Sequence, residues 1–172
     1  MTELRKIGLE DMLQLQKIGR QTFQETFSDG NTEENMTKYL TEEFSAEKLS
    51  AELSNPNTEF YFATLDNTAI GYLKLNFGGS QTELQDEKGL EIERIYVLKK
   101  FYGKSVGQLL YEKAIEIAKQ KNMDYIWLGV WEKNERALHF YKKNGFVEFD
   151  KHIFILGDDR QIDLMMKLKL KP

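Results

Sequence analysis

A basic loop with two glycines, at residues 101–107, is the segment whose residue types most clearly suggest chemistry. It lies between an apolar strand and an amphipathic helix. A glycine loop in this position exposes backbone N–H groups, and the helix N-terminus that follows carries partial positive charge. Lys99, Lys100 and Lys104 add further positive charge nearby. The loop therefore predicts a site for a phosphate or pyrophosphate, and hence a phosphorylated cofactor.

The elements that must position this loop can be inferred from periodicity. Apolar residues at helical spacing predict helices, whereas short apolar runs bounded by polar turns predict strands. The predicted strands are residues 4–7, 59–65, 69–76, 90–97, 126–130, 146–156 and 161–170, and the predicted helices are residues 9–27, 33–40, 46–53, 108–121 and 134–143. Four strands precede the loop, the last three of them consecutive, and one crossover helix follows it. This order predicts an α/β (α+β) fold with a mixed sheet, not a doubly wound parallel one.

The strand before the loop carries alternating charged and apolar residues. In a regular strand, alternation places Glu91 and Glu93 on one face and Ile92 and Arg94 on the other. Glu93, in the strand that leads into the predicted phosphate-binding loop, is a candidate proton acceptor, although a solvated or ion-paired surface glutamate is an equally good interpretation.

Length and composition narrow the functional class. The 172 residues predict a single domain spanning residues 1–172, and the absence of cysteine excludes disulfides, thiolate metal sites and a cysteine nucleophile. A net charge of −4 without a basic stripe argues against a nucleic-acid partner. No signal peptide and no stretch of transmembrane length are evident, which predicts a cytoplasmic protein without a membrane partner. His139 and His152 lack metal-ligand spacing, so no metal is expected.

A motif at residues 134–146, Asn-x-x-Ala-x-x-Phe-Tyr-x-x-x-Gly-Phe, resembles the second signature of the GNAT superfamily of N-acetyltransferases. The first signature of that family, Gln/Arg-x-x-Gly-x-Gly/Ala, falls on residues 102–107. Here Tyr102 replaces the first residue and Ser105 replaces the first glycine, while Gly107 is kept. Residues 91–96 and 126–135 are similar to the bacterial spermidine/spermine acetyltransferases of the PaiA type. The resemblance covers nearly the whole chain and implies a mixed, mostly antiparallel central sheet of about seven strands flanked by helices.

The resemblance implies acetyl-CoA as donor and a primary amine as acceptor. Backbone groups of Ile95, Tyr96 and Val97 are then expected to pair with the pantetheine arm and to polarise the thioester carbonyl. Backbone amides of the loop and the first helical turn are expected to hold the pyrophosphate. These residues are Gly103, Lys104, Ser105, Val106, Gly107 and Gln108.

Three residues of the second motif complete the expected donor site. Tyr141 is the candidate general acid, because a phenol with a pKa near 10 is neutral at pH 7 and can protonate a leaving thiolate. The competing interpretation is a packed core aromatic. Asn134 is expected to contact the coenzyme arm, although a helix N-cap alone also accounts for it. Lys143 is expected to reach the coenzyme, with a solvated lysine as the alternative.

Acidic and aromatic residues supply candidates for the acceptor side. Glu93 is the candidate general base that takes a proton from the acceptor ammonium, whose pKa is near 10.4 for a lysine-like amine. Glu132 and Trp131 are rival cation ligands, the second through a cation–π contact. Glu25 and Asp29 lie near the junction of the first two predicted helices, where the family binds its acceptor.

The sequence thus predicts an acetyl-CoA-dependent N-acetyltransferase acting by direct attack in a ternary complex, with a polyamine such as spermidine or spermine as acceptor. One alternative is a family member acting on a protein N-terminus, an amino acid or an aminoglycoside. The other is a non-catalytic acyl-CoA-binding regulatory module. A strand near the C-terminus also makes a homodimer possible.

Overall fold

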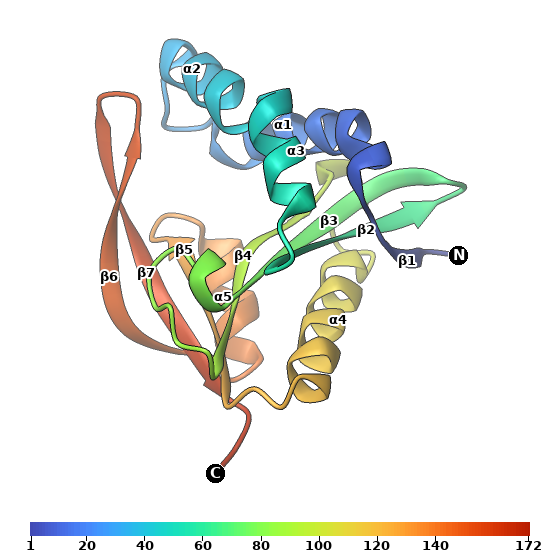
Figure 1. Cartoon of the computed structure of the whole chain (residues 1–172). Coiled ribbons are helices and arrows are strands. Elements are labelled where there is room, and N and C mark those ends of the chain that lie inside the picture. The colour runs from blue at the N-terminus through green and yellow to red at the C-terminus, as the bar shows by residue number, and fades with distance from the viewer.

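A seven-stranded sheet forms the centre of the molecule (Figure 1). The computed structural model describes residues 1–172. The strands are β1 (Glu3–Lys6), β2 (Thr58–Leu65), β3 (Thr68–Phe77), β4 (Gly89–Val97), β5 (Tyr125–Trp131), β6 (Val147–Leu156) and β7 (Asp159–Lys169). The helices are α1 (Met12–Phe27), α2 (Glu33–Glu43), α3 (Ala46–Ser54), α4 (Val106–Gln120) and α5 (Glu135–Lys143). The predicted order of elements is confirmed, with α4 beginning two residues earlier than expected.

The strand order is β1-β2-β3-β4-β5-β7-β6, and every neighbouring pair is antiparallel except β4 and β5. The parallel pairing of β4 with β5 covers only residues 89–91 of β4 and 125–127 of β5. Beyond these residues the two strands separate and leave an opening in the middle of the sheet. The prediction of a mixed, mostly antiparallel sheet is confirmed.

Helices cover both faces of the sheet, with α1, α2 and α3 on one side and α4 on the other (Figure 1). Each face has its own apolar core. The first core joins Leu15, Phe44 and Phe62 on the α1–α3 side. The second joins Leu110 and Ala114 of α4 to the opposite sheet face, together with Tyr141 of α5. Because α4 is apolar along one stripe, it packs flat against the strands and aims its N-terminus at the opening.

A β-bulge in β4 overturns the predicted faces of this strand. Lys74 of β3 pairs with Arg94, but the next residue, Leu75, pairs with Ile92, so Glu93 is an extra residue in β4. The bulge shifts the alternation by one position. Arg94 therefore lies on the same face as Glu93, with its guanidinium 4.5 Å from the centre of the Phe44 ring. The prediction that Arg94 shares a face with Ile92 was wrong, because alternation holds only while every residue is paired.

The β6–β7 hairpin bends away from the sheet toward α2 (Figure 1). At its tip, the Asn35 side-chain amide donates to the Asp158 carboxylate at 2.9 Å, and Gln161 donates to the side chain of Asn31. The hairpin and the α1–α2 corner are thereby linked, and the space between them is enclosed on two sides. The outward face of β6 is apolar and exposed at Val147, Ile153 and Ile155. The homodimer stays a prediction.

None of the helices combines the length and apolar character that a membrane span requires.

Candidate active site

Two cavities meet where β4 and β5 separate. The first, here called the loop cavity, has a volume of about 770 Å³ and is bounded by the end of β4, the glycine loop and α5. The second, here called the acidic cavity, has a volume of about 250 Å³ and is lined by Glu83, Glu91, Glu93 and Asp163 among other residues. Both are lined by Ile95, Tyr96, Asn134, Ala137 and Tyr141. A molecule in one cavity can therefore reach a molecule in the other.

The N-terminus of α4 opens into the loop cavity without a side-chain cap. Ser105 is the N-cap residue, but its φ of 65° is left-handed and its hydroxyl makes no capping hydrogen bond. The first helical bond runs from the Leu109 N–H to the Ser105 carbonyl, so the three preceding N–H groups have no partner within the helix. Gly103 has a φ of 77° and nothing within 4 Å of the position of a Cβ. This geometry suits an anionic oxygen cluster such as a pyrophosphate.

One edge of β4 is free along the opening. Ile95, Tyr96 and Val97 pair with β3 on one side, whereas β5 has already separated from β4 on the other. Alternate N–H and C=O groups on this edge therefore face the cavities without a strand partner. An extended chain with amide groups, such as a pantetheine arm, fits an unpaired edge of this kind.

Helix α5 contributes the remaining predicted residues of the loop cavity. The Asn134 side-chain oxygen accepts from the Ala137 N–H at 3.2 Å, which confirms the N-cap, and its side-chain N–H groups are left to donate into the cavities. Lys143 lines the loop cavity and is exposed. Lys104 is exposed outside the cavity lining, with its ammonium 5.7 Å from the centre of the Phe101 ring.

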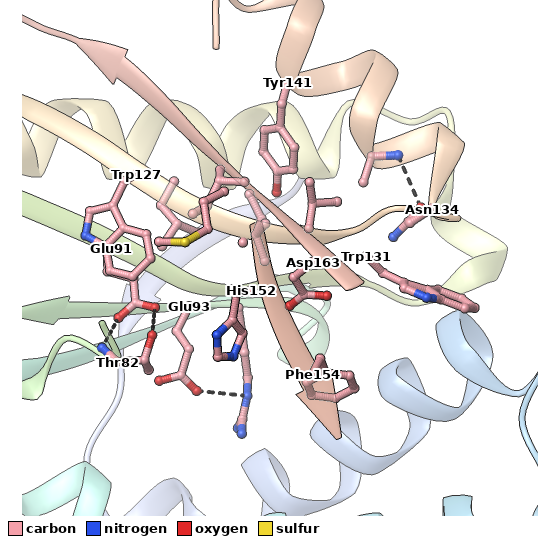
Figure 2. A pocket seen from close by; sticks show the side chains of 18 of the residues that line it. Thr82, Glu91, Glu93, Trp127, Trp131, Asn134, Tyr141, His152, Phe154 and Asp163 are labelled. Atoms are coloured by element: carbon pink, nitrogen blue, oxygen red, sulfur yellow. Dashed lines mark hydrogen bonds and ion pairs between the residues drawn. The ribbon is translucent and has the colours of Figure 1, made fainter. Parts of the chain in front are cut away.

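Tyr141 lies between the two cavities. Its ring packs against Phe140 and Phe146 at centroid distances of 5.4 and 5.5 Å, and its hydroxyl points into the acidic cavity (Figure 2). Burial raises the pKa of the phenol well above its ordinary value, so Tyr141 is neutral at physiological pH. The ring is part of the core, as the packing interpretation predicted, and the hydroxyl is available to a ligand. The role of Tyr141 as general acid stays a prediction.

Two glutamates of β4 are held in different ways. Glu91 accepts hydrogen bonds from Asn76 and from the backbone and hydroxyl of Thr82, and burial raises its pKa despite these bonds. Glu93 is also desolvated, but it lies 2.9 Å from the Lys74 ammonium and 3.6 Å from the Arg94 guanidinium. These cations outweigh the desolvation and lower the pKa of Glu93 to about 2. Glu93 is consequently a weak proton acceptor as it stands, and its role as base stays a prediction.

Sequence reasoning missed Asp163 of β7, together with His152 and Glu83, as cavity-lining residues. Figure 2 shows Asp163 and His152 side by side in the acidic cavity. His152 Nδ1 contacts the Glu83 carboxylate. Burial raises the pKa of Asp163 to about 6, with His152 lowering it and Glu83 raising it further. The only sequence signal was an acid beside the apolar run Leu164–Met166, and its importance depends on strand register.

The residues predicted to bind the acceptor amine do not lie together in the structure. Trp131 lines the acidic cavity, with its ring 5.2 Å from that of Phe27. Glu25 instead lines the loop cavity, where its carboxylate accepts from the Lys99 N–H at 3.0 Å. Asp29 and Glu132 are exposed and line neither cavity, although the Glu132 N–H donates to the Ile162 carbonyl at 3.0 Å.

Comparisons with known proteins agree on one family. The profile of the Acetyltransferase (GNAT) family matches residues 16–146. An uncharacterised N-acetyltransferase encoded in the pepI 3′ region of Lactobacillus delbrueckii subsp. lactis is 41% identical over 96% of this chain and 95% of its own length. A spermidine N(1)-acetyltransferase of Thermoplasma acidophilum is 30% identical over 84% of this chain and 87% of its own.

A solved structure gives the same result at the level of the fold. The PaiA N-acetyltransferase from Thermoplasma acidophilum, crystallised in complex with coenzyme A, superposes with a TM-score of 0.81. It is 28% identical, and the match covers 98% of this chain and 99% of that one.

Proposed function

Because this chain belongs to the acetyltransferase (GNAT) family and is an acetyl-CoA-dependent N-acetyltransferase, we propose that its acceptor is a polyamine such as spermidine. The observation that carries this proposal is the acidic cavity, which opens onto the donor side at Tyr141. Four carboxylates line it against one guanidinium and one imidazole. Such a lining attracts a cation and disfavours an anion.

The residues of the loop cavity fit coenzyme A as the carrier of the acetyl group. The uncapped amides of Val106, Gly107 and Gln108 suit its pyrophosphate, and the free edge at Ile95, Tyr96 and Val97 suits its pantetheine arm. When bound, it supplies a thioester carbonyl open to attack by an amine. Asn134 and Lys143 line the same cavity and are proposed to contact it.

The proposed chemistry is direct transfer between the two cavities. The chain has no cysteine to carry an acetyl group, and the shared lining lets the amine reach the donor without an intermediate carrier. Tyr141 is proposed to donate its hydroxyl proton to the departing sulfur. Its raised pKa keeps that proton in place until it is needed.

Aromatic rings beside the carboxylates support an extended aliphatic cation. Trp131, Phe27 and Phe154 line the acidic cavity, and their rings suit the methylene segments and ammonium groups of a polyamine. Asp29, Glu25 and Glu132 lie outside this cavity and are proposed only as outer charges that attract a polycation.

Arg94 supports a second class of acceptor molecule. This buried guanidinium lines the acidic cavity, and its Nη1 atom has no hydrogen-bond partner in the protein. An unsatisfied guanidinium nitrogen suits a carboxylate oxygen. The alternative acceptor is therefore an amine that carries a carboxylate, such as an amino acid.

An acceptor panel tests the proposal. Thiol release from acetyl-CoA is measured with spermidine, spermine, lysine, an N-terminal peptide and an aminoglycoside under the same conditions. We expect the highest kcat/KM with spermidine or spermine. Faster release with lysine would favour the carboxylate-bearing class, and equal rates with all acceptors would overturn the polyamine assignment. Coenzyme A binding without release with any amine would point to the regulatory module.

A further inference from the structure

Asp163 occupies the middle of a row of side chains that crosses three strands. It pairs directly with Trp131 of β5 on one side and with His152 of β6 on the other. Directly paired residues project from the same face of a sheet, so all three point into the acidic cavity. The carboxylate lies beside the backbone of Gly129 of β5, where a Cβ would be in ordinary van der Waals contact with Asp163 Oδ2 at 3.5 Å.

The other carboxylates of the cavity are already engaged. Glu93 is held by Lys74 and Asn76, and Glu91 accepts from Asn76 and Thr82. Glu83 contacts His152. Asp163 is the one cavity carboxylate with neither a hydrogen-bond donor nor an ion-pair partner in the protein. It is therefore free to accept from a ligand.

We propose that Asp163 is the catalytic group that takes the proton from the acceptor ammonium. This inference rests on the proposed transfer to an amine, but it does not depend on which amine is used. An acceptor nitrogen in the acidic cavity contacts Asp163 from one side and approaches the opening beside Tyr141 from the other.

Transfer of the acetyl group to the acceptor nitrogen involves two proton losses from that nitrogen. The ammonium gives one proton to the Asp163 carboxylate, and the freed lone pair forms the N–C bond to the acetyl carbonyl carbon. The C–S bond breaks and its electron pair leaves with sulfur, which takes a proton from the Tyr141 hydroxyl. The nitrogen loses its second proton, which restores the hydroxyl. Asp163 then releases its proton to solvent as the acetamide leaves.

The surroundings of Asp163 suit it to take up and release a proton. Burial in the partly apolar cavity raises its pKa to about 6, which makes it a better proton acceptor than an ordinary aspartate while it stays ionised at pH 7. The titratable and charged groups that share the cavity come from four further elements and one loop. They are Tyr39 of α2, Glu83 of the loop before β4, Glu91, Glu93, Arg94 and Tyr96 of β4, Tyr141 of α5 and His152 of β6.

The test is the pH dependence of kcat/KM in wild type and in Asp163→Asn, measured from pH 5 to 9.5 with whichever amine of the panel is turned over fastest. For wild type we expect an acid limb near pH 6. For the variant we expect a loss of roughly 10²- to 10⁴-fold at pH 7 and no such limb. The deficit should shrink about tenfold per pH unit above 7, because the free amine fraction rises by that factor until its pKa is reached.

Matched controls separate this role from others. Asp150→Asn makes the same change at an exposed site on β6 and should retain wild-type rates. Glu93→Gln should retain the acid limb. A constant deficit at all pH values in Asp163→Asn would indicate that the carboxylate only holds the cation, and a deficit below threefold would exclude any role. Either result overturns the proposal.

A second measurement applies if no amine is acetylated, in which case the polyamine function itself fails. The ¹³C carboxyl signal of Asp163, assigned by its loss in Asp163→Asn, is titrated with and without n-butylamine. Titration near pH 6 with a shift on adding the amine supports the proposal. Titration below pH 4.5, or indifference to the amine, contradicts it.

Discussion

Burial has the same physical effect on Tyr141 and Asp163 and suits each to the opposite task proposed for it. Burial disfavours the charged form of each side chain, so it raises both pKa values. For the phenol, this keeps a proton in place for donation. For the carboxylate, it moves the proton affinity toward the working pH.

At Tyr141, replacement by Phe removes the hydroxyl and leaves the ring. We expect kcat to fall by roughly 10²- to 10⁴-fold, because the departing sulfur loses its proton donor. Binding of coenzyme A should stay within about threefold of wild type, since the aromatic contacts to Phe140 and Phe146 remain. Single-turnover kinetics and calorimetric titration with coenzyme A measure the two quantities. A parallel loss of both would identify a packing role instead.

At Asp163, the Asn variant should be more stable than wild type at neutral pH. The folded pKa of about 6 lies above the ordinary value of 3.8, so the carboxylate stabilises the fold only while protonated, below about pH 4. This contribution is lost as pH rises through 6. Thermal unfolding should therefore show a higher Tm for Asp163→Asn at pH 7.5 and nearly equal values at pH 4. A lower Tm at pH 7.5 would refute the burial argument.

Sequence reasoning identified Tyr141 but not Asp163, and the reason is physical. Tyr141 lies in a local motif within one helix, where spacing alone fixes which residues face the cofactor loop. The role proposed for Asp163 depends on its pairing with Trp131, 32 positions away in the chain, which places its side chain in the acidic cavity. Pairing register between distant strands is not encoded in a short pattern.

At the scale of elements, the start of α4 combines strain with an anion site. Ser105 holds a left-handed backbone, which costs a residue with a Cβ roughly 1 kcal/mol relative to glycine, and its hydroxyl caps nothing. We expect Ser105→Gly to be more stable than Ser105→Ala by about 1 kcal/mol. Urea denaturation measures the difference, and coenzyme A titration should show tighter binding for the Gly variant. Equal stability would mean that the loop carries no strain.

At the β3–β4 bulge, ion pairs between side chains connect these two strands to α3. The Lys74 ammonium, 3% exposed, lies 2.7 Å from Glu52 of α3 and 2.9 Å from Glu93. Glu93→Gln leaves this buried cation with one partner, so we expect a loss of about 3 kcal/mol in the free energy of unfolding at pH 7.5. Because the pKa of Glu93 is lowered to about 2, its stabilisation is present above pH 4.5 and lost as pH falls toward 2. The difference between variant and wild type should therefore vanish at low pH in denaturant titrations.

The bulge also marks where strand prediction failed. The run of residues 90–97 is correctly a strand, but strict alternation assigned Arg94 to the α4 face. The extra residue in β4 can be identified only from the register of its pairing with β3. The start of α3 was predicted correctly from Ser45, whose side chain accepts from the Lys48 N–H as an N-cap. The start of α2 was also predicted correctly, but the helix continues to Glu43, three residues beyond the predicted end.

On the scale of the whole molecule, charge is divided between the two cavities. The net charge of −4 conceals basic side chains at Arg136 and Lys143 in the loop cavity and four carboxylates in the acidic cavity. We expect KM for spermidine to rise as ionic strength increases from 0.02 to 0.5 M, since salt screens the attraction between the acidic cavity and a polycation. Initial rates at saturating acetyl-CoA measure this. n-Butylamine, with a single charge, is the control and should show a smaller change.

The two cavities are lined by different parts of the chain. Most residues of the loop cavity come from residues 95–144, whereas the acidic cavity takes residues from Phe23 on α1 to Met165 on β7. The short pairing of β4 with β5 is what lets these two sets meet. In terms of descent, substitutions at Phe27, Trp131 or Phe154, which line the acidic cavity alone, can change the acceptor while the donor chemistry is inherited intact. The split sheet thus allows acceptor choice to evolve separately from the binding of the donor.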